Sequence, residues 1–143
     1  MSKAMRSLLC AMLSVVLLFT MTAWTGATVS AEEVQPRFSY TNYTFTAMDI
    51  TTKGIATCHA DVEGYDGITT KIHIKMQLQK YEHFWWSTLE TWEATFYDVV
   101  GDLSKTATVG SGRYRVKATY TVYSGSASEE IVAYSQEDVF TMS

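Results

Sequence analysis

The chain has 143 residues and carries 11 basic side chains against 15 acidic ones, a formal net charge of −4. This length fits one ordinary domain. The acidic balance argues against general nucleic-acid binding, which requires a basic surface.

The N-terminus has the pattern of a secretory signal peptide over residues 1–31. Lys3 and Arg6 form a basic head, an apolar run follows over residues 8–19, and small residues precede an expected cut after Ala31. The run is about a dozen residues long, shorter than the roughly 20 that a transmembrane helix needs. An uncleaved anchor is therefore the weaker alternative, and we expect a secreted, extracellular protein.

Cleavage leaves a single domain of residues 32–143, large enough to bury about two-thirds of its unfolded surface. Loss of Lys3 and Arg6 leaves nine basic side chains against fifteen acidic ones, a net charge of −6. Cys58 is the only cysteine left, whereas small secreted domains commonly pair theirs in disulfides. Because alanines and a valine alternate with Cys58, we expect a buried thiol, with an interchain disulfide as the alternative.

Period-two alternation and regularly spaced turns predict seven strands and no helix in the mature domain. The expected strands are residues 39–45, 55–63, 70–81, 89–97, 103–109, 111–123 and 129–136. Three strands have clear inward faces: Ala56, Cys58, Ala60 and Val62; Ile72, Ile74, Met76 and Leu78; and Tyr114, Val116, Ala118, Tyr120 and Val122. The last strand leaves two registers open, with either Ile131 and Ala133 or Val132 and Tyr134 facing inward. The pattern predicts an all-β, immunoglobulin-like β-sandwich of about seven antiparallel strands.

Three positions match the core of immunoglobulin domains. In those domains a cysteine on the second strand faces a cysteine on the sixth, and a tyrosine lies two residues before the latter. Here Cys58 takes the first position, Val116 the second and Tyr114 that of the tyrosine. We therefore expect the Tyr114 ring to be buried and its hydroxyl to bond a backbone carbonyl upstream.

Segments 56–62, 70–80 and 112–125 resemble an uncharacterised family, a domain of unknown function found in small secreted proteins of Gram-positive bacteria. The three segments occur in the same order and cover most of the mature chain. The resemblance implies the same sandwich fold and export route. It supplies no activity and no catalytic residues.

The histidines and carboxylates do not form a recognisable active site. His59 and His73 are expected to point outward from opposite sheets, so they cannot share a metal ion. His59, Asp61 and Glu63 line one outward face, but alternate strand residues lie about 7 Å apart, which is wide for a closed zinc site. We expect a solvated face there, no catalytic residue, no metal and no cofactor. A hydrolase is the least favoured reading.

The first candidate ligand site is an aromatic cluster of Tyr81, Phe84, Trp85 and Trp86 near an expected hairpin turn. Exposed aromatic rings stack on sugars and anchor protein interfaces. The alternative is that Trp92 and one of Trp85 and Trp86 fill the core. Adjacent strand residues point to opposite faces, so Trp85 and Trp86 cannot both be buried.

The second candidate is a basic face on the third and sixth strands. It comprises Lys71, Lys75, Arg113, Arg115 and Lys117. Such a face fits an anionic surface polymer, such as a teichoic acid or an acidic glycan. The alternative, which we favour from sequence alone, is cross-strand pairing with Glu90, Glu129 or Glu130.

Taken together, these features predict a secreted, non-catalytic binding module for a glycan or a cell-surface protein. We expect it to be monomeric or weakly associating, with no nucleic-acid partner and no stable membrane insertion after signal cleavage. A secreted antimicrobial or inhibitory effector is the alternative.

Overall fold

The computed structural model describes residues 38–143, so the predicted signal peptide and its cleavage site lie outside the described residues. Eight strands make up this part of the chain: β1 (Thr41–Ile50), β2 (Ile55–Gly64), β3 (Lys71–Glu82), β4 (Trp85–Phe96), β5 (Val100–Thr108), β6 (Gly112–Ser124), β7 (Ala127–Tyr134) and β8 (Asp138–Phe140). Within residues 38–143, no helix has the length and hydrophobicity needed to cross a membrane. The all-β prediction is confirmed.

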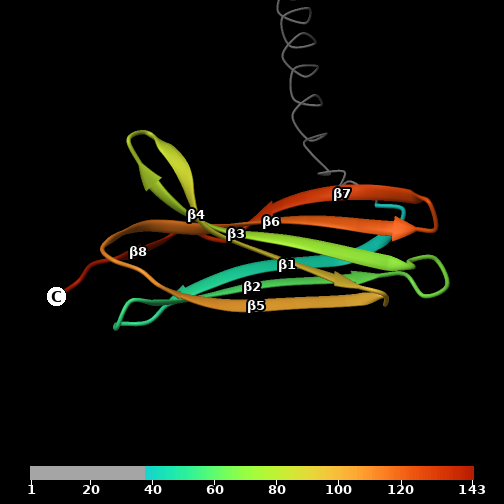
Figure 1. Ribbon diagram of the computed structural model, residues 1–143, viewed down its shortest axis with the longest axis horizontal. Helices are drawn as coiled ribbons and strands as arrows, with labels where there is room; N and C mark the ends of the chain where they lie inside the picture. The colour runs from blue at the N-terminus through green and yellow to red at the C-terminus, as the bar shows by residue number, and fades with distance from the viewer. Residues whose placement is uncertain (1–37) are drawn as a thin grey trace, which may run out of the picture. The chain divides into compact units, whose positions relative to one another are not determined.

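The strands form two antiparallel sheets that lie one over the other (Figure 1). The small sheet has the order β1-β2-β5, and the large sheet has the order β4-β3-β6-β7, with β8 also paired to β6. β7 and β8 pair with successive parts of β6, because Lys117 to Ser124 face β7 and Gly112 to Tyr114 face β8. The large sheet therefore has β4 at one edge and the β7–β8 pair at the other.

The core lies between the sheets and consists of the three inward faces expected from the sequence. All thirteen of those side chains have relative exposures of 0–2%. Each large side chain that is fully buried in this way contributes about 1.5–3 kcal/mol. Cys58 is a free, buried thiol within this core, which opposes the interchain-disulfide alternative.

The end of the chain settles the register left open by the sequence. Ile131 is buried and Ala133 packs against the core, whereas Val132 and Tyr134 are exposed on the outer side. The short strand β8 was not expected. It forms because the chain turns back to β6 after Tyr134, where the Ser135 backbone N–H donates to the Val116 carbonyl oxygen over 2.9 Å.

The start of the sixth strand has the corner expected from the sequence. The Tyr114 side chain is 1% exposed, and its hydroxyl donates to the Gly110 carbonyl oxygen over 2.8 Å. The prediction of a buried ring with an upstream carbonyl partner is confirmed. This bond fixes the path of the chain into β6, the strand that carries Arg113, Arg115 and Lys117.

Two strand boundaries differ clearly from the expectation, and that of β4 matters for function. β4 begins at Trp85 instead of residue 89, and β1 continues to Ile50 instead of ending at residue 45. The aromatic cluster therefore belongs to a regular β3–β4 hairpin, with Tyr81 paired to Trp86 and Glu82 paired to Trp85. The pairing continues this far because the turn uses only His83 and Phe84.

Candidate functional site

The β3–β4 hairpin ends in a strained turn. His83 and Phe84 both have positive φ angles, 52° and 73°, the pattern of a two-residue turn whose central positions favour asparagine and glycine. A bulky residue such as phenylalanine is an outlier in this conformation. The sequence predicts a hairpin turn between residues 81 and 89, but with no glycine or asparagine in that stretch it does not show that the turn itself is only His83 and Phe84.

This turn displays two large apolar side chains to solvent. Phe84 is 93% exposed and Trp85 is 64% exposed. We call His83, Phe84 and Trp85 the hairpin tip. Figure 1 shows this end of the hairpin rising away from the large sheet. A register shift between Leu78 and Gln79 accounts for the bend, since β-bulges kink and twist a strand pair.

Trp85 and Trp86 point to opposite faces of the hairpin, as the alternation predicts. Neither belongs to the hydrophobic core, and Trp92 is the tryptophan that packs against it. Trp86 is partly buried and lies against Tyr81, with 5.3 Å between the ring centroids. The alternative in which one of these two tryptophans fills the core is therefore wrong, because both lie beyond the end of the sandwich interior.

Trp86 joins the aromatic cluster to the basic face. The Arg115 guanidinium lies between two rings, with its central carbon 4.2 Å from the Trp86 centroid and 4.2 Å from the Tyr134 centroid. Arg113 lies 5.7 Å from the Tyr81 ring. We call the set Arg113, Tyr81, Trp86, Arg115 and Tyr134 the arginine–aromatic row. Two members of the aromatic cluster, Tyr81 and Trp86, thus share a surface with two members of the basic face, Arg113 and Arg115, whereas Trp85 lies on the other side of the hairpin.

Two members of this surface were missed from the sequence. Tyr134 was a candidate core residue, because the register of β7 was ambiguous. Gln79 alternates with the inward residues of the third strand and so is on its outward face, yet it is only 7% exposed and its Oε1 accepts a 2.9 Å hydrogen bond from Arg115 Nε. The period-two pattern of the third strand places Gln79 on this face but gives no sign of its burial.

The expected carboxylate partners of the basic face do not pair with it. Within residues 38–143, none of its five side chains forms an ion pair with a carboxylate. Glu129 instead accepts hydrogen bonds from the Ser39 and Tyr40 backbone N–H groups over 2.9 and 2.7 Å. Its side chain shares the inward side of β7 with Ile131, so it reaches the start of β1 and not the outer face. The cross-strand pairing that we favoured from sequence is therefore wrong.

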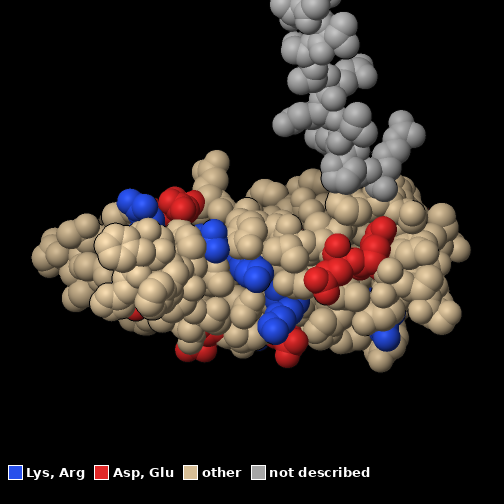
Figure 2. Space-filling view, turned by 90° about the horizontal axis from the view of Figure 1, so that it is seen from above, with Lys and Arg blue, Asp and Glu red and all other residues tan. Residues whose placement is uncertain are grey.

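Aromatic rings take the place of those carboxylates. Besides the arginine–aromatic row, Lys71 Nζ lies 4.0 Å from the Tyr123 ring centroid. Glu93 is opposite Lys75 in the strand register, but its carboxylate lies 3.3 Å from His73 Nε2. Figure 2, seen from the large-sheet side of Figure 1, shows a diagonal row of Lys and Arg, with a group of acidic side chains to its right and others at the upper left and the lower edge. Cation–π contacts stabilise the arginine side chains but do not neutralise their positive charge.

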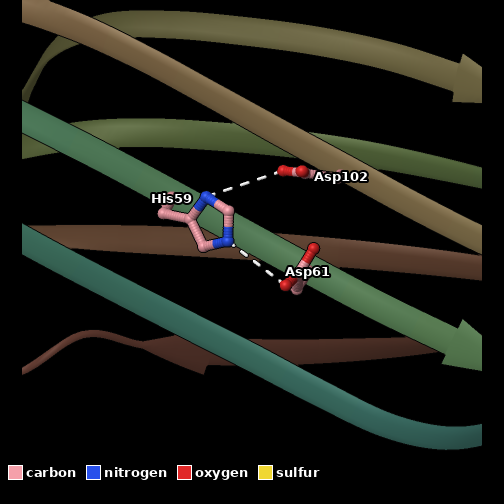
Figure 3. Close-up of side chains that lie close together, drawn as sticks. All are labelled: His59, Asp61 and Asp102. Atoms are coloured by element: carbon pink, nitrogen blue, oxygen red, sulfur yellow. Dashed lines mark hydrogen bonds and ion pairs between the residues drawn. The ribbon is translucent and has the colours of Figure 1, made fainter.

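A separate polar cluster lies on the outer face of the small sheet (Figure 3). His59 Nε2 is 3.2 Å from Asp61 Oδ2, and His59 Nδ1 is 3.5 Å from Asp102 Oδ1. Asp102 replaces the expected Glu63, because β5 places it directly opposite Asp61. One ligand atom from each of these three residues lies within 4.8 Å of the other two, a spacing that could hold a metal ion. The arrangement is that of an imidazole bridging two carboxylates.

The remaining candidate groups are also held in place by neighbours. His59 and His73 lie on different sheets, as expected, and His73 Nδ1 is 2.9 Å from Thr95 Oγ1.

An open pocket of about 280 Å³ lies where the edges of β4 and β5 meet, lined in part by Leu78, Trp92 and Val109. Its lining includes one carboxylate, Glu90, and no histidine or cysteine. Thr106 and Thr108 are its other polar residues.

No family model matches the chain, and searches of curated proteins and of solved structures found no match. The resemblance to an uncharacterised family of Gram-positive bacteria therefore stays a prediction.

Proposed function

We propose that this chain is a secreted, non-catalytic binding module that holds a glycan against the hairpin tip and the neighbouring outer face of the large sheet. The observation that carries the proposal is the exposure of Phe84 and Trp85, 93% and 64%, on a strained turn. Exposing two large apolar rings is unfavourable in water, and a bulky residue at positive φ adds strain. Both costs are expected of a site that awaits a ligand.

The surroundings of the tip suit a flat, polar ligand. Trp85 presents an open ring on one side of the hairpin, and the arginine–aromatic row lies on the other. Aromatic rings stack on the apolar faces of sugars, and the adjoining polar groups bond the hydroxyls. Because Trp86 and Tyr81 already pack on each other and on arginines, we assign the stacking to Phe84 and Trp85.

The proposal includes an immunoglobulin-like topology. Support comes from the strand order, since β2 lies beside β5 in one sheet, and β3, β6 and β7 are neighbours in the other. These positions correspond to strands B and E and to strands C, F and G of immunoglobulin domains. The Tyr114 corner at the start of β6 adds to that support. Secretion is supported by the sequence pattern of residues 1–31.

Binding is favoured over catalysis by the state of the potential reactive groups. Cys58 is fully buried, and burial raises the pKa of its thiol to about 11, so the nucleophilic thiolate is disfavoured. His59 and His73 each have both ring nitrogens in contact with neighbouring side chains. His73 does contact the Thr95 hydroxyl and the Glu93 carboxylate through its two ring nitrogens, but Thr95 and Glu93 are exposed on the sheet surface and do not line the pocket between β4 and β5, whereas catalysis needs a site that holds the substrate against the nucleophile.

Tryptophan fluorescence tests the proposal. Protein spanning residues 32–143, which contains the compact unit Arg37–Ser143, is titrated with a panel of neutral and acidic polysaccharides. A saturable blue shift with at least one of them, lost in Trp85→Ala and Phe84→Ala, is expected. Tyr97→Ala is the matched control, since Tyr97 is 83% exposed at the far end of β4. Unchanged affinity in both tip variants, or no binding to any polysaccharide, would contradict the proposal.

A further inference from the structure

We infer that the glycan is acidic and that its carboxylate groups dock on the free edge of the Arg115 guanidinium. This inference rests on the proposed function and names the ligand class of the same site. It starts from the setting of one side chain, Arg115, which contacts two aromatic rings and is only partly buried.

Arg115 is held in a single orientation. Its guanidinium carbon lies 4.2 Å from the Trp86 ring centroid and 4.2 Å from the Tyr134 ring centroid, and Nε donates to Gln79 Oε1 over 2.9 Å. Gln79 is 7% exposed, and its Nε2 lies 3.4 Å from Thr88 Oγ1, so the acceptor is itself positioned. A flexible side chain is thereby fixed before any ligand arrives, which removes part of the entropic cost of binding.

The part of the guanidinium left for a ligand is its terminal fork. Among residues 38–143, Nε to Gln79 is the only hydrogen bond that Arg115 makes through its side chain. In the same range, no side-chain nitrogen or oxygen is both buried and without a hydrogen-bond partner. The two terminal nitrogens of Arg115 are therefore not completely buried. A planar fork with four free N–H groups matches a carboxylate in a bidentate pair.

The charge around Arg115 favours an anion with several acidic groups. Arg113 and Lys117 lie two residues to either side of Arg115 on the same outer face of β6, and Lys71 and Lys75 lie on neighbouring β3. Within residues 38–143 none of these cations is ion-paired, although the whole chain has a net charge of −4. A local excess of positive charge on an acidic protein attracts anions to that face and repels them elsewhere.

The ligand class follows from the two halves of the surface. The hairpin tip offers rings for stacking on sugar faces, and Arg115 lies behind it with a fork that fits carboxylates. A polysaccharide built from uronic acids carries both a sugar ring and a carboxylate in each repeat. The ligand that fits both halves is therefore a uronic-acid polysaccharide.

The test compares two polymers that share a backbone and differ only in charge. Polygalacturonate and its fully methyl-esterified form are titrated into the wild-type protein of residues 32–143 at low and at physiological salt. The wild type should bind polygalacturonate at least tenfold more tightly than the ester, and added salt should reduce that preference. Equal affinity for the two polymers would overturn the inference and leave the proposed function standing.

Variants locate the preference at Arg115. Arg115→Lys keeps the charge but loses the fork and the stacking, and it should lose most of the preference for polygalacturonate. Lys53→Gln removes an exposed charge in the turn before β2 and should change nothing. Because Arg115→Lys also removes packing, Arg113→Gln and Lys117→Gln are measured too, and each should weaken binding by a smaller factor.

The remaining outcomes separate the inference of carboxylate binding at Arg115 from the proposed function of glycan binding. Wild-type affinity in Arg115→Lys would overturn the inference. If a neutral polysaccharide of the panel binds and polygalacturonate does not, the inference fails alone. If no polysaccharide of either kind binds, both the inference and the proposed function fail.

Discussion

The Arg115 guanidinium lies 4.2 Å from the centre of the Trp86 ring, and this contact joins two features that are 29 positions apart in the sequence. One is an aromatic hairpin and the other a strand with basic residues at alternate positions. Their contact turns the outer face of the large sheet into one surface that is both charged and aromatic. It also ties the base of the hairpin to β6, so that the exposed tip is carried on a fixed support.

Trp85 and Trp86 should have opposite roles in stability and binding. Trp86→Ala removes ring contacts with Arg115 and Tyr81 and should lower the free energy of unfolding by about 1–3 kcal/mol. Trp85→Ala changes an exposed side chain and should stay within about 0.5 kcal/mol of the wild type, while it abolishes glycan binding. Urea unfolding of the two variants provides the measurement. Equal destabilisation would contradict the arrangement of the hairpin.

Phe84→Gly should make the protein more stable and weaken its binding to glycans. Glycine adopts the positive φ of this turn, 73°, without steric cost. Relief of about 1–3 kcal/mol of backbone strain should outweigh the cost of about 0.4–1 kcal/mol from the more flexible unfolded chain, so the free energy of unfolding should rise. The same change removes a ring from the proposed stacking site, so glycan affinity should fall. Thermal unfolding and a polysaccharide titration of the same sample test both parts. A loss of stability would show that the Phe84 ring has a structural role.

Tyr114→Phe should isolate the contribution of the corner hydrogen bond. The hydroxyl donates to the Gly110 carbonyl oxygen over 2.8 Å in a buried setting, and its loss should cost about 1 kcal/mol and leave the carbonyl underbonded. Tyr97→Phe, at an exposed tyrosine, is the control and should have no effect. Equal unfolding midpoints for the two variants would contradict the structural role assigned to Tyr114.

The bridging histidine on the small sheet should stabilise a pair of like charges. Asp61 and Asp102 are directly opposite each other, an unfavourable arrangement for two carboxylates, and His59 contacts both. His59→Ala removes the 3.2 Å contact with Asp61 and should lower the free energy of unfolding by about 0.5–1 kcal/mol. Adding Asp102→Asn should recover part of that loss. Additive effects of the two changes would show that the groups do not interact.

Stability should fall as the pH rises above 9. Burial raises the pKa of the Cys58 thiol from its usual 9.0 to about 11, so above pH 9 the unfolded chain releases a proton that the folded chain retains. Folding then becomes less favourable by on the order of 1 kcal/mol per pH unit. Burial also raises the pKa of Tyr120, from 10.0 to about 12, which adds the same effect above pH 10. Cys58→Ala should flatten the pH dependence between pH 9 and 10, and an unchanged slope would contradict this origin.

The core was predictable because period-two alternation in β2, β3 and β6 depends only on each strand's own residues. Tyr114 could be identified in the same way, since its neighbour two residues on, Val116, is part of that alternation. The contact of Arg115 with Trp86 and Tyr134 could not be predicted. It depends on the order of four strands, on the register of β7 and on a turn at His83 and Phe84 that lacks the usual turn residues.

The small sheet shows the same limit. Asp61 was recognisable as a neighbour of His59 because both lie on β2. Asp102 was not, because its place opposite Asp61 depends on the pairing of β2 with β5. Contacts within one strand could be read from the sequence, whereas contacts across strands needed the register.

An amide chemical-shift titration with polygalacturonate tests the central claim most directly. Uniformly ¹⁵N-labelled protein of residues 32–143 is used, and perturbations are mapped on the sequence. The account predicts saturable shifts at residues 81–86, at Arg113, Arg115 and Lys117, and at Tyr134, with no change at His59 or Asp61. Shifts confined to the small sheet, or none at all, would contradict it.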